Sequence, residues 1–256
     1  MSGNGRICYL GDDHPGAAAA YLCGIMNHSG LAFDHVPSGE EPGPDFTRQT
    51  YSLYVVSDYP VAFFPQACME HVAKCVRAGA GLAMLGGWES YHGRLGEYPQ
   101  TPLAEALPVE MRDRDDRHNC SQLCLVNRVA DHEIVDGLPF GTPPGIGGFN
   151  LFEPRRDAQV VLKAQEYAIR RLPEGEVVLD AREEFPLLVV GEYGLGRTVA
   201  LATDVAPHWV GGFVDWGDAR VTAQVGDGFV EVGNWYARFF RNLLVWAGRL
   251  ESASQA

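Results

Sequence analysis

The sequence lacks any apolar run long enough to cross a membrane, and its first residues carry one basic side chain and a very short apolar run. A membrane helix needs about 20 consecutive apolar residues, and a secretory signal needs a basic start followed by an apolar stretch. Both absences predict a cytoplasmic protein. Positive charge is also scarce, because 20 Lys and Arg stand against 33 Asp and Glu, a net charge of −13. Nucleic acids and anionic membranes bind positive surfaces, so neither is expected as a partner.

Nucleotide-binding loops are missing as well. No Walker-type phosphate loop is present, and the glycines of PPGIGGFN (143–150) do not form the G-x-G-x-x-G pattern of a strand-to-helix turn. The six cysteines include one close pair, Cys120 and Cys124, but no second pair to complete a zinc site. We therefore expect free thiols, no cofactor and no metal site.

Strand and helix signals alternate through the first third of the chain. Short apolar runs predict buried strands, and the alanine-rich or amphipathic stretches between them predict helices. The strands are expected at 6–10, 31–37, 51–57 and 81–85, and the helices at 17–26 and 65–78. This alternation predicts a mainly parallel sheet between two layers of helices, a flavodoxin-like three-layer α/β sandwich.

The rest of the chain is less regular. Residues 91–158 are rich in proline and glycine, and their charged run, 111–119, is interpreted as a solvated loop. Residues 176–205 predict paired strands with a turn at 194–196, which make a small antiparallel extension. Residues 234–249 predict a helix with one aromatic face.

The predicted organisation is a single domain. It covers residues 1–250, and a disordered tail is expected over 251–256, where the side chains are small and polar.

Polar side chains follow four of the predicted strands at the point where each strand ends. If these strands are parallel neighbours, the four loops share one rim of the sheet, where open α/β sheets bind their ligands. The loops are Gly11 to His14, Ser57 to Tyr59, Gly86 to His92 and Asp204 to Trp209.

Three strings connect the chain to a known family. They are GGWESYHG (86–93), PPGIGGFN (143–150) and ATDVAPHWVGGFVDWGD (202–218). With the order of elements, they make the chain resemble the glutamine amidotransferase-like family. That family belongs to the class I glutamine amidotransferase superfamily and is related to trehalose-utilisation-type proteins. The resemblance covers essentially the whole chain and implies the fold more firmly than an activity.

In active members of the superfamily, a cysteine on a sharp strand-to-helix bend attacks the side-chain amide of glutamine, and a histidine paired with a glutamate activates it. The resemblance implies that Gly87 lies at or beside the nucleophile's place and that Asp204 lies near the histidine's place. No cysteine occurs from 76 to 119. The chain is therefore expected to lack glutaminase activity. The matching bend consists of Gly86, Gly87, Trp88, Glu89 and Ser90.

We expect the rim to bind a small polar, sugar-like ligand, and we assign no catalytic residue. The candidate ligand-binding residues are Asp12, His14, Asp58, Glu89, His92, Asp204, His208 and Trp209. The alternative is a hydrolase or sugar-processing enzyme that uses carboxylates and histidines of the same rim. A hydrogen bond between Glu89 or Asp204 and one of these histidines would favour that alternative. Such a cluster could also bind a divalent metal, although nothing in the spacing demands one.

Several candidates also have a purely structural interpretation. Asp12 can stabilise the start of a helix, and Ser90 can cap one rather than act as a nucleophile. The segment 208–218 interleaves aromatic, glycine and acidic residues. Its tryptophans suit core cover as well as contact with a ligand or a second copy of the chain, so a homo-oligomer stays open.

Overall fold

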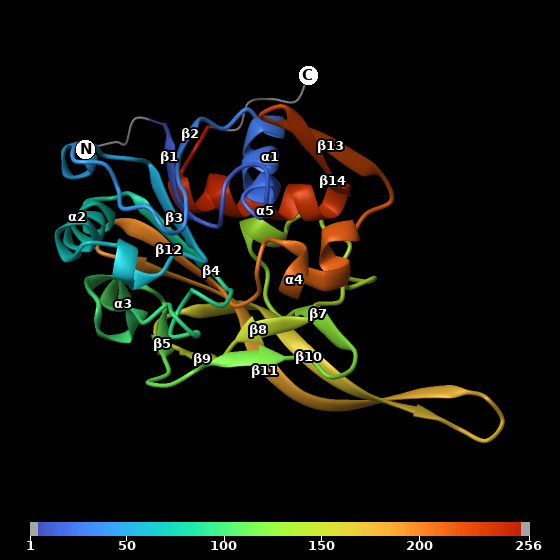
Figure 1. The fold of residues 1–256 in the computed structure, drawn as a ribbon. Helices are drawn as coiled ribbons and strands as arrows, with labels where there is room; N and C mark the ends of the chain where they lie inside the picture. The colour runs from blue at the N-terminus through green and yellow to red at the C-terminus, as the bar shows by residue number, and fades with distance from the viewer. Residues whose placement is uncertain (1–4, 252–256) are drawn as a thin grey trace.

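The computed structural model describes residues 5–251, and a mixed sheet runs through its centre (Figure 1). Its strand order is β2-β1-β3-β4-β12-β11-β10-β7. The first five strands are parallel to one another, and each pairing from β12 onward to β7 is antiparallel. The order β2-β1-β3-β4 is that of a flavodoxin-like sheet, which confirms the predicted fold class. The predicted disordered tail lies outside the described residues, except for Glu251.

The parallel strands are short and mostly buried. β1, β3 and β4 have no exposed residue, because helices cover the sheet on both faces. Their side chains join one hydrophobic cluster with the inner faces of the helices. The bounds are β1 (Ile7–Gly11), β2 (Phe33–Val36), β3 (Leu53–Ser57), β4 (Gly81–Leu85) and β12 (Gly196–Leu201).

The order of the strands places the first two helices on opposite faces of the sheet. α1 (Ala20–His28) connects β1 to β2, and α2 (Gln66–Arg77) connects β3 to β4. These connections run in opposite directions from the centre of the sheet, so right-handed crossovers place the two helices on opposite faces. α5 (Asn234–Gly248) packs beside α1 and against β3, β4 and β12. No helix of the described part of the chain is long and apolar enough to cross a membrane.

Local boundaries differ from the sequence predictions by a few residues. The first helix begins at Ala20 rather than at Ala17, because Ala17 is part of a turn in which its amide donates to the His14 carbonyl oxygen (2.8 Å). The C-terminal helix forms within one residue of its predicted bounds. All six cysteines are free thiols, as predicted.

The middle of the chain is more ordered than the sequence suggested. β5 pairs with β9 and β6 pairs with β8, both antiparallel, and β7 extends the main sheet. The partners are distant in sequence and the strands are short, so no local periodicity marks them. The elements are α3 (Pro102–Ala106), β5 (Val109–Met111), β6 (Arg117–Asn119), β7 (Cys124–Arg128), β8 (Gly148–Asn150) and β9 (Phe152–Pro154).

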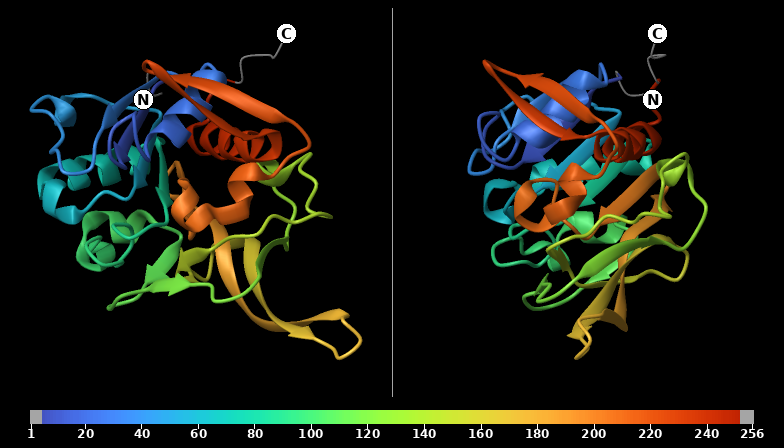
Figure 2. Two further views of the ribbon diagram at one scale, coloured as in Figure 1. Left: turned by 45° about the vertical axis from the view of Figure 1, so that its right-hand side comes forward. Right: turned by 90° about the vertical axis from the view of Figure 1, so that its right-hand side faces the viewer.

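A long antiparallel hairpin projects from the body (Figures 1 and 2). It consists of β10 (Gln159–Arg171) and β11 (Val177–Tyr193), and its outer part, residues 167–181, is here called the arm. The predicted turn at 194–196 does connect β11 to β12. The outer half of β11 pairs instead with β10, which the sequence analysis did not assign. Proline has no amide hydrogen to donate to a neighbouring strand. β11 can contain Pro186 because β12 pairs with β11 only from Leu188 onward, so Pro186 lies at an open edge of the sheet where no donor is needed.

Shortening the arm should leave the body folded. Replacing residues 169–179 with Asn-Gly would close a two-residue hairpin between Ala168 and Asp180, which lie directly opposite each other. The removed Ile169, Val177 and Leu179 are 46–58% exposed, so little apolar burial is lost. We expect the Tm to change by less than about 3 °C in circular dichroism. A fall of roughly 10 °C would show that the arm stabilises the body.

A second hairpin packs against α1. It consists of β13 (Arg220–Val225) and β14 (Gly228–Gly233). Gly24 of α1 permits the close approach, because a Cβ there would lie 2.6 Å from Cγ2 of Val230. Glycine inside a helix costs about 0.5–1 kcal/mol relative to alanine, and the packing of the hairpin offsets that cost.

Candidate functional site

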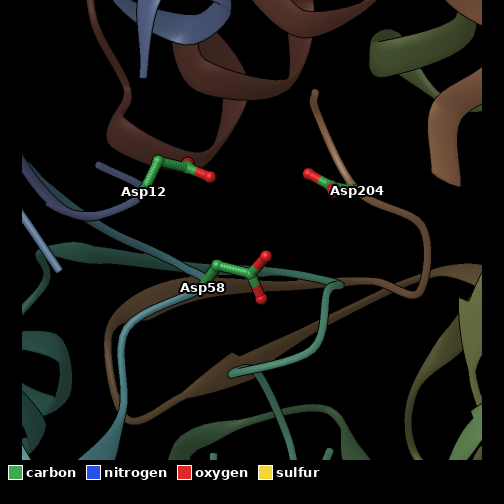
Figure 3. A group of neighbouring side chains, drawn as sticks. All are labelled: Asp12, Asp58 and Asp204. Carbon is green, nitrogen blue, oxygen red and sulfur yellow. The ribbon is translucent and has the colours of Figure 1, made fainter. Parts of the chain in front are cut away.

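Three aspartates converge at the carboxyl ends of parallel strands (Figure 3). Asp12 directly follows β1, Asp58 directly follows β3, and Asp204 comes shortly after β12. One carboxyl oxygen from each lies within 4.8 Å of those of the other two. The connections of the sheet diverge between β1 and β3, so Asp12 and Asp58 flank the switch point where sheets of this kind bind ligands. These three residues are called the aspartate cluster below.

The backbone at the cluster is locally strained. Asp12 and Asp58 both have left-handed conformations, with φ of 53° and 43°. Aspartate tolerates this region better than most residues, but it is still uncommon outside functional and tightly held positions. The Asp12 amide donates to the Ser57 carbonyl oxygen (2.8 Å), and the Ser38 hydroxyl donates to the Asp58 carbonyl oxygen. These contacts hold both turns in place.

Each carboxyl group of the cluster is also oriented by a hydrogen bond from the protein. The donors are the Tyr9 hydroxyl to Asp12, the Glu89 amide to Asp58 (2.7 Å) and the Ala206 amide to Asp204 (2.9 Å). In Figure 3 the three groups point toward one another across a common space. No salt bridge within residues 5–251 includes any of them. The three carboxyl groups therefore lie together without a basic partner.

Burial and mutual repulsion make these carboxyl groups hard to ionise. Burial, with the nearby charge of Asp12, raises the pKa of Asp58 to about 8. Burial also raises the pKa of Asp12 to about 6, although the hydrogen bond from Tyr9 opposes the shift. Burial, followed by the charges of Asp58 and Asp12, raises the pKa of Asp204 well above its usual range. At neutral pH the cluster therefore retains protons that exposed aspartates would have lost.

The bend after β4 has no room for a side chain at Gly87. A Cβ there would lie 2.0 Å from Oδ1 and 2.5 Å from Oδ2 of Asp58. Asn150 holds the same bend from the other side. Its Oδ1 accepts from the Gly87 amide (2.9 Å), and its Nδ2 donates to the Gly87 carbonyl oxygen (3.1 Å). The carboxyl group of Asp58 thus occupies the space that a residue larger than glycine would need.

Asn150 and Asp116 are two buried polar residues that the sequence analysis missed. Nδ2 of Asn150 donates to Oδ1 of Asp116 (2.7 Å), and Asp116 also accepts from the amides of His92 and Gly93 (both 3.0 Å). The interpretation of the run 111–119 as solvated is therefore wrong at Asp116, which is fully buried. The only available signal for Asn150 was its place at the end of the glycine-rich string 143–150.

The other residues of the bend act on its shape. Ser90 is buried, and its hydroxyl accepts from the Asp58 amide (3.0 Å). The predicted helix cap at Ser90 is wrong, because no helix begins there. Trp88 is half-buried, with the Arg117 guanidinium 4.6 Å and the His208 ring 5.4 Å from its ring centre.

None of the three candidate histidines joins the aspartate cluster. His14 is exposed, and its Nδ1 accepts from the Gly16 amide (3.1 Å). Nδ1 of His92 is 3.2 Å from the Gly93 carbonyl oxygen, and His208 is exposed against Trp88. In the described part of the chain, no hydrogen bond joins a histidine to Glu89 or Asp204.

The segment 208–218 covers the core. It forms α4 (Pro207–Val210) and a 3₁₀ turn rather than an open loop. Trp209 is 1% exposed, and its indole N–H donates to Oδ1 of Asn119 (2.8 Å). Trp216 is 8% exposed and donates to the Thr142 carbonyl oxygen (2.9 Å). The core interpretation is confirmed for both tryptophans, and neither presents a free ring face.

A hollow of about 430 Å³ opens beside the aspartate cluster. Glu89, whose amide holds Asp58, and Asp13, which follows Asp12, are in its wall. The wall includes three carboxylates and no basic side chain, and it also contains apolar surface. Its residues are Asp13, Ser38, Gly39, Pro60, Ala62, Phe63, Glu89, Leu95 and Glu97.

The sheet order and the loops at its carboxyl rim define a flavodoxin-like α/β protein. The chain belongs to the family described as putative glutamine amidotransferase, whose model matches residues 59–227. No curated protein matches the sequence. The family assignment agrees with the resemblance drawn from the three strings.

Solved structures share the fold over nearly the whole chain. One cytoplasmic protein of Salmonella typhimurium is 25% identical, with a TM-score of 0.69 over 94% of this chain and 98% of that one. A second from the same organism is 24% identical, with a TM-score of 0.72 over 94% and 99%. A ThuA-like protein of Parabacteroides merdae is 15% identical, with a TM-score of 0.56 over 98% and 92%.

Proposed function

We propose that this protein is a member of its family without glutaminase activity, and that it binds a small hydrogen-bond-donating ligand at the carboxyl rim of the sheet. The observation that carries the proposal is the acidic hollow beside the aspartate cluster. Ionised carboxylates only accept hydrogen bonds, so the ligand must bring donors, as sugar hydroxyls or an ammonium group do. Phe63 and Leu95, 37% and 51% exposed, offer apolar surface to the carbon face of a sugar.

Binding can be tested with ligand-observed NMR on a panel of sugars, polyols and small amines. For the compound that binds, Glu89→Gln should weaken the affinity by about 10-fold, because a charge-assisted hydrogen bond is replaced by a neutral one. The matched control is Glu105→Gln, since Glu105 is exposed on α3 outside this hollow. Equal affinities in the two variants, or no binding across the panel, would reject the site.

The absence of glutaminase activity is supported by the bend after β4. Gly87 has no side chain to act as a nucleophile, and Asp58 fills the adjoining space. Asp204 sits after β12, near the place that the family resemblance assigns to the activating histidine. A thiol mechanism needs both a thiolate and a base, and the bend supplies neither.

Gly87→Cys should therefore not create a glutaminase. The new Cβ would collide with the Asp58 carboxyl group, and Asp204 rather than a histidine lies near the place that the family resemblance assigns to the activating base. We expect ammonia release from glutamine to equal the blank, for both the wild type and the variant, in a coupled glutamate dehydrogenase assay. The double variant Gly87→Cys/Asp58→Ala removes the collision and serves as the control. Wild-type release above the blank that persists after Cys120→Ala and Cys124→Ala would contradict the proposal.

The hydrolase alternative gains no support, because the histidine contact that would favour it is not made by the described residues. We propose the cytoplasm as the location, because the two Salmonella typhimurium proteins are described as cytoplasmic. Cell fractionation with an antibody to the protein would test this.

A further inference from the structure

We propose that Asp12, Asp58 and Asp204 bind a hard divalent cation, such as Ca²⁺ or Mn²⁺. One oxygen of each carboxyl group lies within 4.8 Å of the other two. A point equidistant from three atoms 4.8 Å apart is about 2.8 Å from each, and a small inward rotation brings that distance to about 2.3–2.6 Å, the range of Ca²⁺–oxygen bonds. Three carboxylates and no sulfur or imidazole ligand select a hard cation over a soft one.

A second observation at the same rim points to a bound ligand. The Ser57 hydroxyl is completely buried and has no hydrogen-bond partner. It adjoins the Asp12 carboxyl group of the cluster. A buried hydroxyl without a partner costs about 1–3 kcal/mol. An ion in the cluster, or a water molecule in its shell, would give this hydroxyl a partner.

The carboxyl groups are oriented before any ion arrives. The Tyr9 hydroxyl, the Glu89 amide and the Ala206 amide each hold one of them. Such outer contacts fix the direction of metal ligands and reduce the ordering needed on binding. No metal site was expected from the sequence, because the cysteines are an incomplete zinc set and nothing in the spacing of the rim residues demands an ion. Their grouping depends on the parallel pairing of β1 with β3 and of β4 with β12.

Cation binding at the cluster is a property beyond the proposed ligand binding at the hollow, and either one can be absent without the other. The cluster lies at the switch point of the sheet, and the hollow opens beside it. The cation can be measured with no organic ligand present. A protein that binds the cation but none of the compounds in the panel would retain this site and lose the proposed function.

Terbium luminescence gives a direct test, because Tb³⁺ replaces Ca²⁺ and is excited by nearby aromatic rings. Tyr9 hydrogen-bonds to Asp12 and is placed to excite it. Protein stripped with a chelator should give saturable emission with one site per chain, and Ca²⁺ should compete it away. Asp58→Asn and Asp204→Asn should each weaken binding by at least about 10-fold. Asparagine keeps the size of the side chain and tolerates the left-handed backbone of residue 58.

Asp157→Asn is the matched control, because it removes the same charge from an exposed side chain between β9 and β10, outside both the cluster and the hollow. Its affinity should stay within about 3-fold of the wild type, as expected for screened surface charge. The absence of saturable emission from the wild type would overturn the inference. So would an equal loss in Asp157→Asn and Asp58→Asn, which would mean a diffuse acidic surface. Circular dichroism would show that each variant is folded.

Discussion

Replacing Asn150 with alanine should lower the free energy of unfolding by about 3–5 kcal/mol. Asn150 is completely buried and makes three hydrogen bonds, two to the backbone of Gly87 and one to Asp116. Alanine leaves each of those partners without its bond in a region with little access to water. An unsatisfied buried polar group costs about 1–3 kcal/mol, so the effects should accumulate. Urea denaturation followed by circular dichroism would measure the change.

Asn242→Ala is the control for that experiment. Asn242 is half-buried and makes one long bond to the Ile134 carbonyl oxygen (3.3 Å), so its loss should cost less than about 1 kcal/mol. If the two variants lose equal stability, the Asn150 network does not hold the bend. Asn150→Ala should also weaken binding at the rim, because Gly87 lies against the Asp58 carboxyl group.

Replacing Asp58 with asparagine should stabilise the protein at alkaline pH in the presence of a chelator. The pKa of Asp58 is raised from 3.8 to about 8, chiefly by burial and then by the charge of Asp12. Because the folded pKa is above the unfolded one, the folded state keeps a proton that the unfolded chain has released. Wild-type stability should therefore fall as pH rises from about 4 to about 8. Asparagine carries no charge and still accepts the Glu89 amide hydrogen bond.

We expect the wild type to lose on the order of 3 kcal/mol more than Asp58→Asn between pH 5 and pH 8, a Tm difference of roughly 5–10 °C. The chelator keeps cations from the carboxylates, so that only proton binding changes. Asp157→Asn should follow the wild-type curve, because its side chain is exposed and lies outside the cluster. Parallel curves for Asp58→Asn and the wild type would mean that Asp58 is ionised throughout this range.

The parallel half of the fold could be predicted from the sequence because its signals are local. Strands β1, β3 and β4 are continuous apolar runs that each end at, or directly before, a glycine or a polar residue. The stretches between them have helical composition or period, so α1 and α2 were placed to within a few residues. In contrast, β10 and the short strands of the middle region take partners that no local pattern identifies.

The candidate site, too, could be predicted from the sequence only in part. The sequence identified three candidates, Asp12, Asp58 and Asp204, because each comes at or shortly after the end of a predicted strand. Trp209 was predicted to bind a ligand because of the unusual residues around it, but it is packed in the core. Asn150 could not be found, because its importance depends on where its amide group meets the backbone of Gly87.

By itself, the sequence determined the alternation of strands and helices, the acidic charge, the absence of a thiol at the bend after β4, and which polar residues end the strands. These properties depend on composition and on neighbours a few positions apart. Only the tertiary structure decided that β1, β3, β4 and β12 lie side by side and so bring three aspartates together. It also decided that Asp58 fills the space at Gly87. The reason is that distances between strand ends depend on long-range pairing, which no short stretch of sequence specifies.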